Sequence, residues 1–267
     1  MSTIVLRSVK GSPLTHNEVD DNFNNLNVDK IQSGDTVAAL TITTLTTTND
    51  ATINGVTVGK GANSVATNTV LGVDALDAAV TGANNVAIGK DALTTNTSGY
   101  NNTALGSGAA SGLTTGGDNV AVGFNTMLAT VTGNENTAIG NDSLKALTTG
   151  NNNVAAGANA LAANASGINN TAVGTNSLQD NTTGDYNTAI GQAALGDNTT
   201  ADNNTAVGKS ALRVNTTGQY NVAVGNYALD ANTTAQQNTA VGVFGLSANT
   251  TGTQNTAMGY AALITNT

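Results

Sequence analysis

The sequence predicts a mainly β protein, a parallel β-solenoid in which short strands stack along one axis. The main observation is a strict period of 17 residues, shown by glycines that recur without insertion from Gly72 to Gly259. Asparagines recur with the same spacing from Asn68 to Asn255. The second observation is composition, because aromatic residues make up only 3% of the chain and charged residues only 9%. A short strict period built from small side chains is typical of stacked rungs rather than of a thick globular core.

The first predicted element is a helix within residues 1–32. Thr15 followed three residues later by Glu18 fits a capping box, which satisfies free amides at a helix start. Apolar residues then share one helical face: Val19, Phe23 and Leu26. Because one short helix is marginal alone, we expect this face to pack against copies of itself in a trimeric bundle.

Residues 33–67 are predicted to form a β-rich neck. Aliphatic side chains alternate there with threonine, a pattern typical of short strands. The dipeptide Asn54-Gly55 predicts a tight turn between two of these strands. The neck therefore joins the helix to the repeats.

Residues 68–267 are predicted to form a solenoid shaft of twelve 17-residue rungs, whose positions we number from the leading asparagine. Positions 1 to 5 are expected to form a short strand, as at residues 85–89. In one rung, Val86 and Ile88 then point one way, whereas Ala87 and Gly89 point the other. The sequence alone leaves open which of these two faces lies inside.

The rest of the rung is expected to contain a second extended piece, at residues 91–94, and a turn at residues 96–99. Two aliphatic ladders are expected to build a thin, dry core. One is position 9, from Leu76 to Leu263. The other is position 4, which holds Leu71, Ile88, Leu105, Val122, Ile139, Ala156, Val173, Ile190, Val207, Val224, Val241 and Met258.

Position 3 is alanine in every rung from Ala87 to Ala257. A column that never holds a larger side chain lets another backbone approach closely. We interpret this column as a candidate interface between subunits.

The asparagine columns could be ligands, but stacked asparagines are more readily explained by hydrogen bonds along the axis or to turn backbone. A calcium-binding nonapeptide pattern is absent from the sequence. Threonine columns could present an ice-binding face, although most threonines lie beside asparagine and glycine in expected turns.

Aromatic residues of the repeats avoid both ladders and occupy expected corners, at positions 6, 7, 16 and 17. They are Tyr100, Phe124, Tyr186, Tyr220, Tyr227, Phe244 and Tyr260. Two interpretations stay open. The rings could pack over a corner or against a neighbouring subunit, or they could be exposed contacts for a glycan or a protein receptor.

Composition excludes several function classes. The net charge is −9 and the repeats hold few lysines or arginines, so we expect no nucleic-acid binding. No apolar run reaches the length of a membrane span, so we expect no membrane insertion. The only histidine, His16, lacks catalytic or metal-binding partners in the sequence, and there is no cysteine. We therefore expect no enzyme activity, no cofactor and no metal.

The motif Asn-Thr-Ala-Val-Gly-x-x-Ala-Leu, repeated over residues 68–267, resembles the head repeat of trimeric autotransporter adhesins. This resemblance implies a left-handed parallel β-roll with three chains packed around one axis. The family's shortest head repeat is a few residues shorter, so the Asn-Thr-Thr-Gly corner is a departure from its pattern.

The N-terminal segment Val5 to Asn27 is similar to the start of many bacteriophage tail-fibre proteins. The resemblance implies a homotrimeric virion fibre that attaches to a baseplate or tail protein through its N-terminus. Its distal part would meet a glycan or protein on the host surface. The first ten residues lack the apolar stretch of a secretory signal, which agrees with a virion location.

Two alternatives remain. The chain could form a non-viral extracellular filament, structural or adhesive, by end-to-end stacking. It could also be an ice- or ion-binding solenoid.

Overall fold

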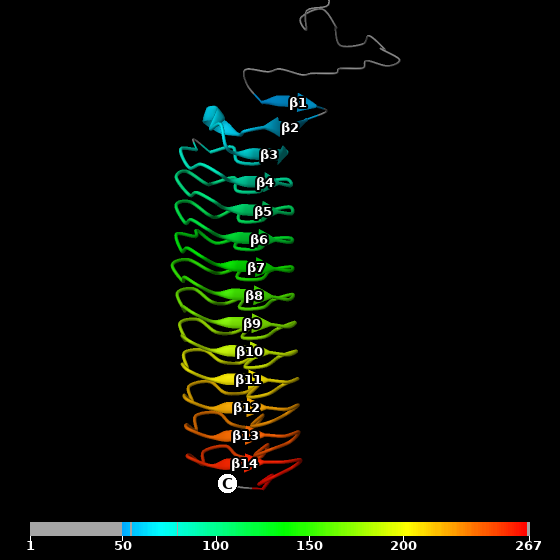
Figure 1. Cartoon of the computed structure of the whole chain (residues 1–267), viewed down its shortest axis with the longest axis vertical. Helices are drawn as coiled ribbons and strands as arrows, with labels where there is room; N and C mark the ends of the chain where they lie inside the picture. The colour runs from blue at the N-terminus through cyan, green and yellow to red at the C-terminus, as the bar shows by residue number, and fades with distance from the viewer. Residues whose placement is uncertain (1–49, 54, 79, 266–267) are drawn as a thin grey trace, which may run out of the picture. The chain divides into compact units, whose positions relative to one another are not determined.

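A computed structural model describes residues 50–53, 55–78 and 80–265, which form a parallel β-solenoid. Its strands form one sheet in chain order from β1 to β14, each stacked on the one before (Figure 1). From β3 to β14 every pairing is parallel, with eleven steps between neighbouring strands. These strands are β3 (Thr69–Gly72), β4 (Val86–Ile88), β5 (Thr103–Leu105), β6 (Val120–Val122), β7 (Thr137–Ile139), β8 (Val154–Ala156), β9 (Thr171–Val173), β10 (Thr188–Ile190), β11 (Thr205–Val207), β12 (Val222–Val224), β13 (Thr239–Val241) and β14 (Thr256–Met258).

The sequence period is the rung of the coil. Ala189 in β10 pairs with Ala206 in β11, and Thr188 pairs with Thr205, so like positions stack on like positions. The predicted solenoid of 17-residue rungs is therefore confirmed. Position 5 shows why the repeat is strict: Gly174 has φ 130°, and a Cβ there would lie 2.7 Å from the carbonyl carbon of Gly191. Only glycine fits such a corner.

The hairpin before the first rung confirms the predicted tight turn. Strands β1 (Ala51–Ile53) and β2 (Val56–Gly59) pair antiparallel around residues 54–55, and β2 also pairs antiparallel with β3. The Asp50 carboxylate accepts hydrogen bonds from the amides of Lys60 and Gly61, both at 2.6 Å. A 3₁₀ turn, η2 (Ala62–Ser64), then leads into the coil. The rest of the predicted neck, and the predicted helix, lie outside the described residues.

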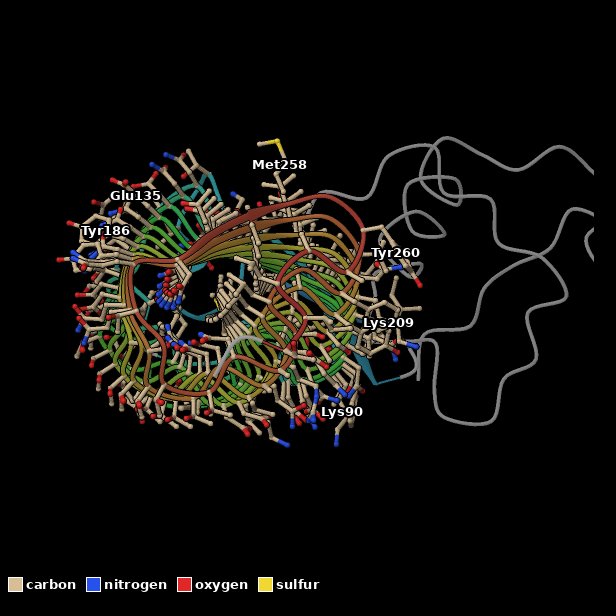
Figure 2. All side chains as sticks on the ribbon, turned by 90° about the horizontal axis from the view of Figure 1, so that it is seen from below. Lys90, Glu135, Tyr186, Lys209, Met258 and Tyr260 are labelled. Carbon is tan, nitrogen blue, oxygen red and sulfur yellow. The ribbon has the colours of Figure 1, made fainter. Side chains whose placement is uncertain are left out.

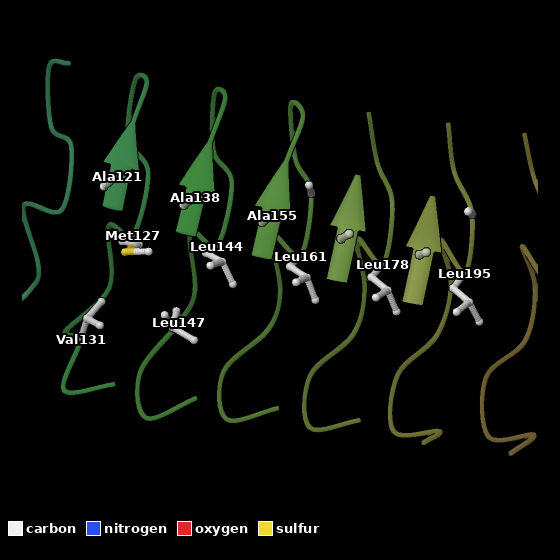
Figure 3. Packing of buried hydrophobic residues seen from close by; sticks show 14 of the residues in the cluster. Ala121, Met127, Val131, Ala138, Leu144, Leu147, Ala155, Leu161, Leu178 and Leu195 are labelled. Carbon is white, nitrogen blue, oxygen red and sulfur yellow. The ribbon is translucent and has the colours of Figure 1, made fainter. Parts of the chain in front are cut away.

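The core is built from alanine and leucine columns. The position 3 alanines are buried on the inner side of the strands, and the position 9 leucines lie close to them (Figure 3). The expected core ladder at position 4 was wrong, because side chains such as Leu105 and Ile139 point outward. The alanine column is likewise no subunit interface. The thin coil already holds leucine and asparagine columns, so little more than a methyl group fits beneath each strand.

The second extended piece expected at residues 91–94 is a turn instead. Asp91 and Leu93 adopt left-handed backbone with φ 58° and 52°, and the equivalent residues of other rungs do the same. A left-handed leucine costs about 1–2 kcal/mol, whereas full burial of its side chain contributes about 1.5–3 kcal/mol. Burial offsets the strain, which explains why a residue with poor turn propensity recurs there.

Two asparagine ladders run inside the coil, as predicted. At position 1, the Asn187 backbone amide donates to Asn170 Oδ1 at 2.9 Å. The Asn187 side chain also donates to the carbonyl of Ala201 at 2.7 Å. At position 12, Asn198 Nδ2 donates to Asn181 Oδ1 at 2.7 Å. Within each ladder the asparagines bond to the identical residue one rung away, which fixes the register of the stack.

Candidate interaction surfaces

The outer face of the sheet is a continuous uncharged stripe, which we call the sheet stripe and define as positions 2 and 4. Position 2 holds only threonine or valine, and position 4 only aliphatic residues or methionine. Six position 4 side chains are between 37% and 46% exposed: Leu71, Leu105, Ile139, Val173, Ile190 and Val224. Met258, at the last described strand, points away from the coil (Figure 2).

The hairpin extends this stripe beyond the first rung, because the exposed Val58 pairs with the exposed Leu71. Contiguous exposed apolar surface on this scale marks a contact site for another molecule. The lack of charge at every stripe position contrasts with a chain of net charge −9. The sequence predicted the opposite facing of the strand, with the position 4 side chains in the core; the structure instead buries the position 3 alanines and exposes position 4.

The aromatic residues lie at two opposite ends of the rung. Figure 2, a view along the coil, shows Tyr186 and Glu135 at one end and Lys90, Lys209 and Tyr260 at the other. We call these ends the position 17 edge and the position 6 edge. The prediction that the aromatics occupy corners is confirmed for both edges.

On the position 6 edge the rings bind one another. Tyr227 and Phe244 are stacked, with centroids 5.4 Å apart and planes 9° from parallel. Phe244 then meets Tyr260 in a T-shaped contact at 6.3 Å. Lys209 Nζ lies 5.8 Å from the centroid of the Tyr227 ring, within range of a cation–π interaction. Equal spacing in the sequence could have predicted the stack, because Tyr227 and Phe244 are one rung apart in one column.

Phe124 belongs to the same edge but lies several rungs away and is 54% exposed. The structure therefore does not bring it together with the ring cluster.

On the position 17 edge the three tyrosines stay apart. Tyr100 covers the next rung, since a Cβ added at Gly117 would lie 2.6 Å from its ring. Tyr186 and Tyr220 are each 55% exposed, with left-handed φ of 56° and 59°. Among the described residues, neither ring stacks on another aromatic side chain.

Charged groups of the coil are sparse and superficial. Among the described residues, three ion pairs lie on the surface: Lys90–Asp91, Lys145–Asp142 and Arg213–Asp197. Burial raises the pKa of the Asp230 carboxyl above 3.8, while a backbone hydrogen bond and the Arg213 charge oppose that rise. In the part of the chain that the structure describes, no cluster of three or more acidic or histidine side chains could hold a metal ion.

The remaining predicted residues, Val19, Phe23 and Leu26, lie outside the described ranges, as does His16. Across the described residues, no helix has the length and apolarity needed to cross a membrane. Comparison with protein-family models, curated proteins and solved structures finds no match for this chain.

Proposed function

We propose that the chain is a structural fibre protein, a bacteriophage tail fibre or related virion appendage that provides reach and attaches to a host surface. The observation that carries this proposal is the sheet stripe on a long, axially bonded coil. Three chains would pack their stripes around a common axis and exclude the aliphatic column from water. Three is the number that the resemblance to adhesin head repeats implies.

The hydrogen bonds between rungs suit a rod that is pulled along its axis. Backbone amides donate along the coil to the next rung, as from Thr188 to the carbonyl of Asn204 at 2.8 Å. The asparagine ladders add side-chain bonds in the same direction. Neighbouring rungs therefore resist separation together, and no catalytic step is part of the proposal.

Attachment to the virion belongs, in this proposal, to residues 1–32, through Val19, Phe23 and Leu26 and a baseplate or tail protein. Host contact belongs to the corner aromatics, which would bind a surface glycan or protein by many weak contacts from three chains. The location is the virion. An extracellular filament without a virion is the alternative, and electron microscopy distinguishes discrete fibres on particles from endless filaments.

The assembly is tested with one charge placed on the stripe. We expect Ile190→Lys to convert trimers to monomers, because three ammonium groups would be desolvated together at the axis. Thr183→Lys puts the same charge on an exposed residue away from the stripe and should leave the trimer intact. Light scattering after size exclusion gives the mass. A monomeric wild-type chain would contradict the trimer.

A second candidate, ice binding, uses the same face. Eight of the twelve position 2 residues, beginning with Thr69 and Thr103, are threonines on a flat parallel sheet. Trimer assembly would cover this column, so the two functions compete for it. Thermal hysteresis that grows with concentration of a monomeric chain would favour ice binding over the fibre.

A further inference from the structure

Tyr186 and Tyr220 form a regular pair on the position 17 edge. They occupy the same position of rungs two apart, with Asn203 in the rung between them. Because neighbouring strands lie ~4.8 Å apart, equivalent atoms of the two tyrosines are roughly 10 Å apart along the axis. Both rings are 55% exposed.

The spacing keeps the two rings from stacking on each other. Where aromatics occupy adjacent rungs, as Tyr227 and Phe244 do, the rings stack and use their faces on each other. Tyr186 and Tyr220 skip a rung and, within the described residues, stack on no other ring. No described aromatic ring covers them, more than half of each residue is exposed, and aromatic faces are the surfaces on which the apolar sides of sugar rings pack.

The backbone at this position does not favour tyrosine. Every described residue at position 17 has positive φ, and the others are asparagine, aspartate, glutamate or glutamine. A bulky residue in left-handed backbone is strained by about 1–2 kcal/mol, and the half-exposed tyrosines offset it with less burial than the fully buried Leu93 does. Strain that packing does not explain is typical of functional positions.

Fixed polar groups flank the pair. The backbone amide of Ile168 donates to Asp185 Oδ1 at 2.7 Å, and that of Asp185 donates to Asp202 Oδ1 at 2.8 Å. These bonds orient both carboxylates and leave a second oxygen on each to accept a bond from a hydroxyl. Planar acceptors beside aromatic faces are the groups that recognise sugars.

We propose that the position 17 edge binds an extended β-1,4-linked polysaccharide lying along the coil, with alternate sugars stacked on Tyr186 and Tyr220. A β-1,4 linkage turns each sugar over relative to the last, so alternate sugars present the same face after about the length of two rungs. An α-1,4-linked chain coils and does not keep that repeat. The inference rests on the proposed attachment function and names the ligand of that surface.

Calorimetry with the full chain tests the pair, using chitohexaose and cellohexaose as probes and maltohexaose as the α-linked control. We expect one or both β-linked probes to bind and maltohexaose not to bind. Tyr186→Asn and Tyr220→Asn should each weaken binding about five- to tenfold. Asparagine occupies this position in other rungs, so the fold is retained. Gln237→Asn, which changes an exposed residue of the same column without removing a ring, is the matched control and should bind normally.

The number of rungs between neighbouring tyrosines provides a second test. Asn152→Tyr adds a ring two rungs before Tyr186 and should tighten binding of the hexasaccharide about fivefold. Asn169→Tyr adds a ring one rung away, where it would stack on Tyr186, and should give no gain. Equal gains from both variants would overturn the inference, as would absence of binding by both β-linked probes.

The mass of each sample separates the two proposals. A trimer that binds neither β-linked probe overturns the polysaccharide site and leaves the fibre standing. A monomer that binds, with loss on Tyr220→Asn, supports the site and overturns the trimer.

Discussion

The two halves of the coil fill the same interior corner in different ways. In the N-terminal half, position 12 varies and holds Asn96, Leu113, Thr130 and Leu147 in successive rungs; Asn96 and the leucines are fully buried, whereas Thr130 is exposed. In the C-terminal half, it holds an unbroken column from Asn164 to Asn249. Both solutions give the same rung. The difference shows that the corner accepts apolar volume, a continuous amide ladder, or a single asparagine bonded to its own turn, as Asn96 is to Gly99.

The ladder is the more specific solution. A leucine can pack against any apolar neighbour, whereas each bond of the asparagine ladder needs its partner at one height in the next rung, as Asn198 needs Asn181. The N-terminal half therefore tolerates variety, including Thr126 and Met127 in core positions. We expect the C-terminal half to resist substitution more strongly.

Interrupting the ladder should have the largest effect. Asn198→Leu removes the donor to Asn181 Oδ1 and the acceptor of Asn215 Nδ2, both in the buried interior. We expect a loss of about 3–5 kcal/mol in the free energy of unfolding, since groups buried without partners cost about 1–3 kcal/mol each. Denaturant titration followed by circular dichroism measures this loss. If Asn198→Leu lowered the free energy of unfolding by less than Leu147→Ala does, the proposed difference between the two halves would be wrong.

The reverse exchange should be milder. Leu147→Asn loses apolar burial, but its new amide lies next to Asn164 and can extend the ladder by one rung. We expect a loss of about 2 kcal/mol, smaller than the 2–5 kcal/mol typical of a leucine-to-alanine change. Leu147→Ala is therefore the matched control in the same titration. If asparagine were worse than alanine there, ladder extension would be refuted.

One substitution in the N-terminal half should stabilise the coil. Thr126 is fully buried and its hydroxyl has no hydrogen-bond partner, whereas most other rungs have alanine at position 8. Thr126→Ala removes the unsatisfied group and should raise the free energy of unfolding by about 1 kcal/mol. A higher midpoint in denaturant is the expected result. Ser143→Ala is the control, because the Ser143 hydroxyl donates to Gly140 and its removal should not stabilise.

The smallest effect is expected at Asp230, on the surface of the C-terminal half. Desolvation raises the pKa of Asp230 in the fold above 3.8, so ionisation opposes folding. At pH values below 3.8 the Asp230 carboxyl is protonated and its burial does not oppose folding. The stability of the fold then decreases as the pH rises through the folded pKa. Asp230→Asn should therefore melt slightly higher than wild type at neutral pH, and this difference should vanish in acid. A gain that persists in acid would exclude this cause.

Much of this molecule could be predicted from periodicity. The rung length, the asparagine ladders and the Asn-Gly hairpin follow from spacing and turn chemistry, because each is a local rule repeated in one column. The facing of the strand could not be predicted, since alternation gives two faces and hydrophobicity favours burying Ile88 over Ala87. The strand face that is buried depends on the leucines of position 9, which pack inside the coil. These leucines have left-handed backbone, a conformation that leucine disfavours, so their place could not be predicted from propensity.

The aromatic surfaces were predicted as positions but not as pairs. Corner placement followed from the pattern, whereas which rings share a face depends on counting rungs between them. Tyr227 and Phe244, on adjacent rungs, stack on each other. Tyr186 and Tyr220 are separated by a rung, do not stack on a described aromatic ring and are each 55% exposed. Column spacing of aromatics is thus a usable signal in any strict solenoid.

The buried ladder also restricts where the chain can be produced. Seven position 12 asparagines stand in the sequence Asn-x-Ser/Thr, the acceptor motif for N-linked glycosylation, and all are fully buried: Asn96, Asn164, Asn181, Asn198, Asn215, Asn232 and Asn249. Oligosaccharide added to the nascent chain would occupy amides that must donate inside the coil. Expression through a eukaryotic secretory pathway should therefore yield glycosylated, uncoiled protein, and replacing the exposed hydroxyl residue two places after each asparagine should restore the coil.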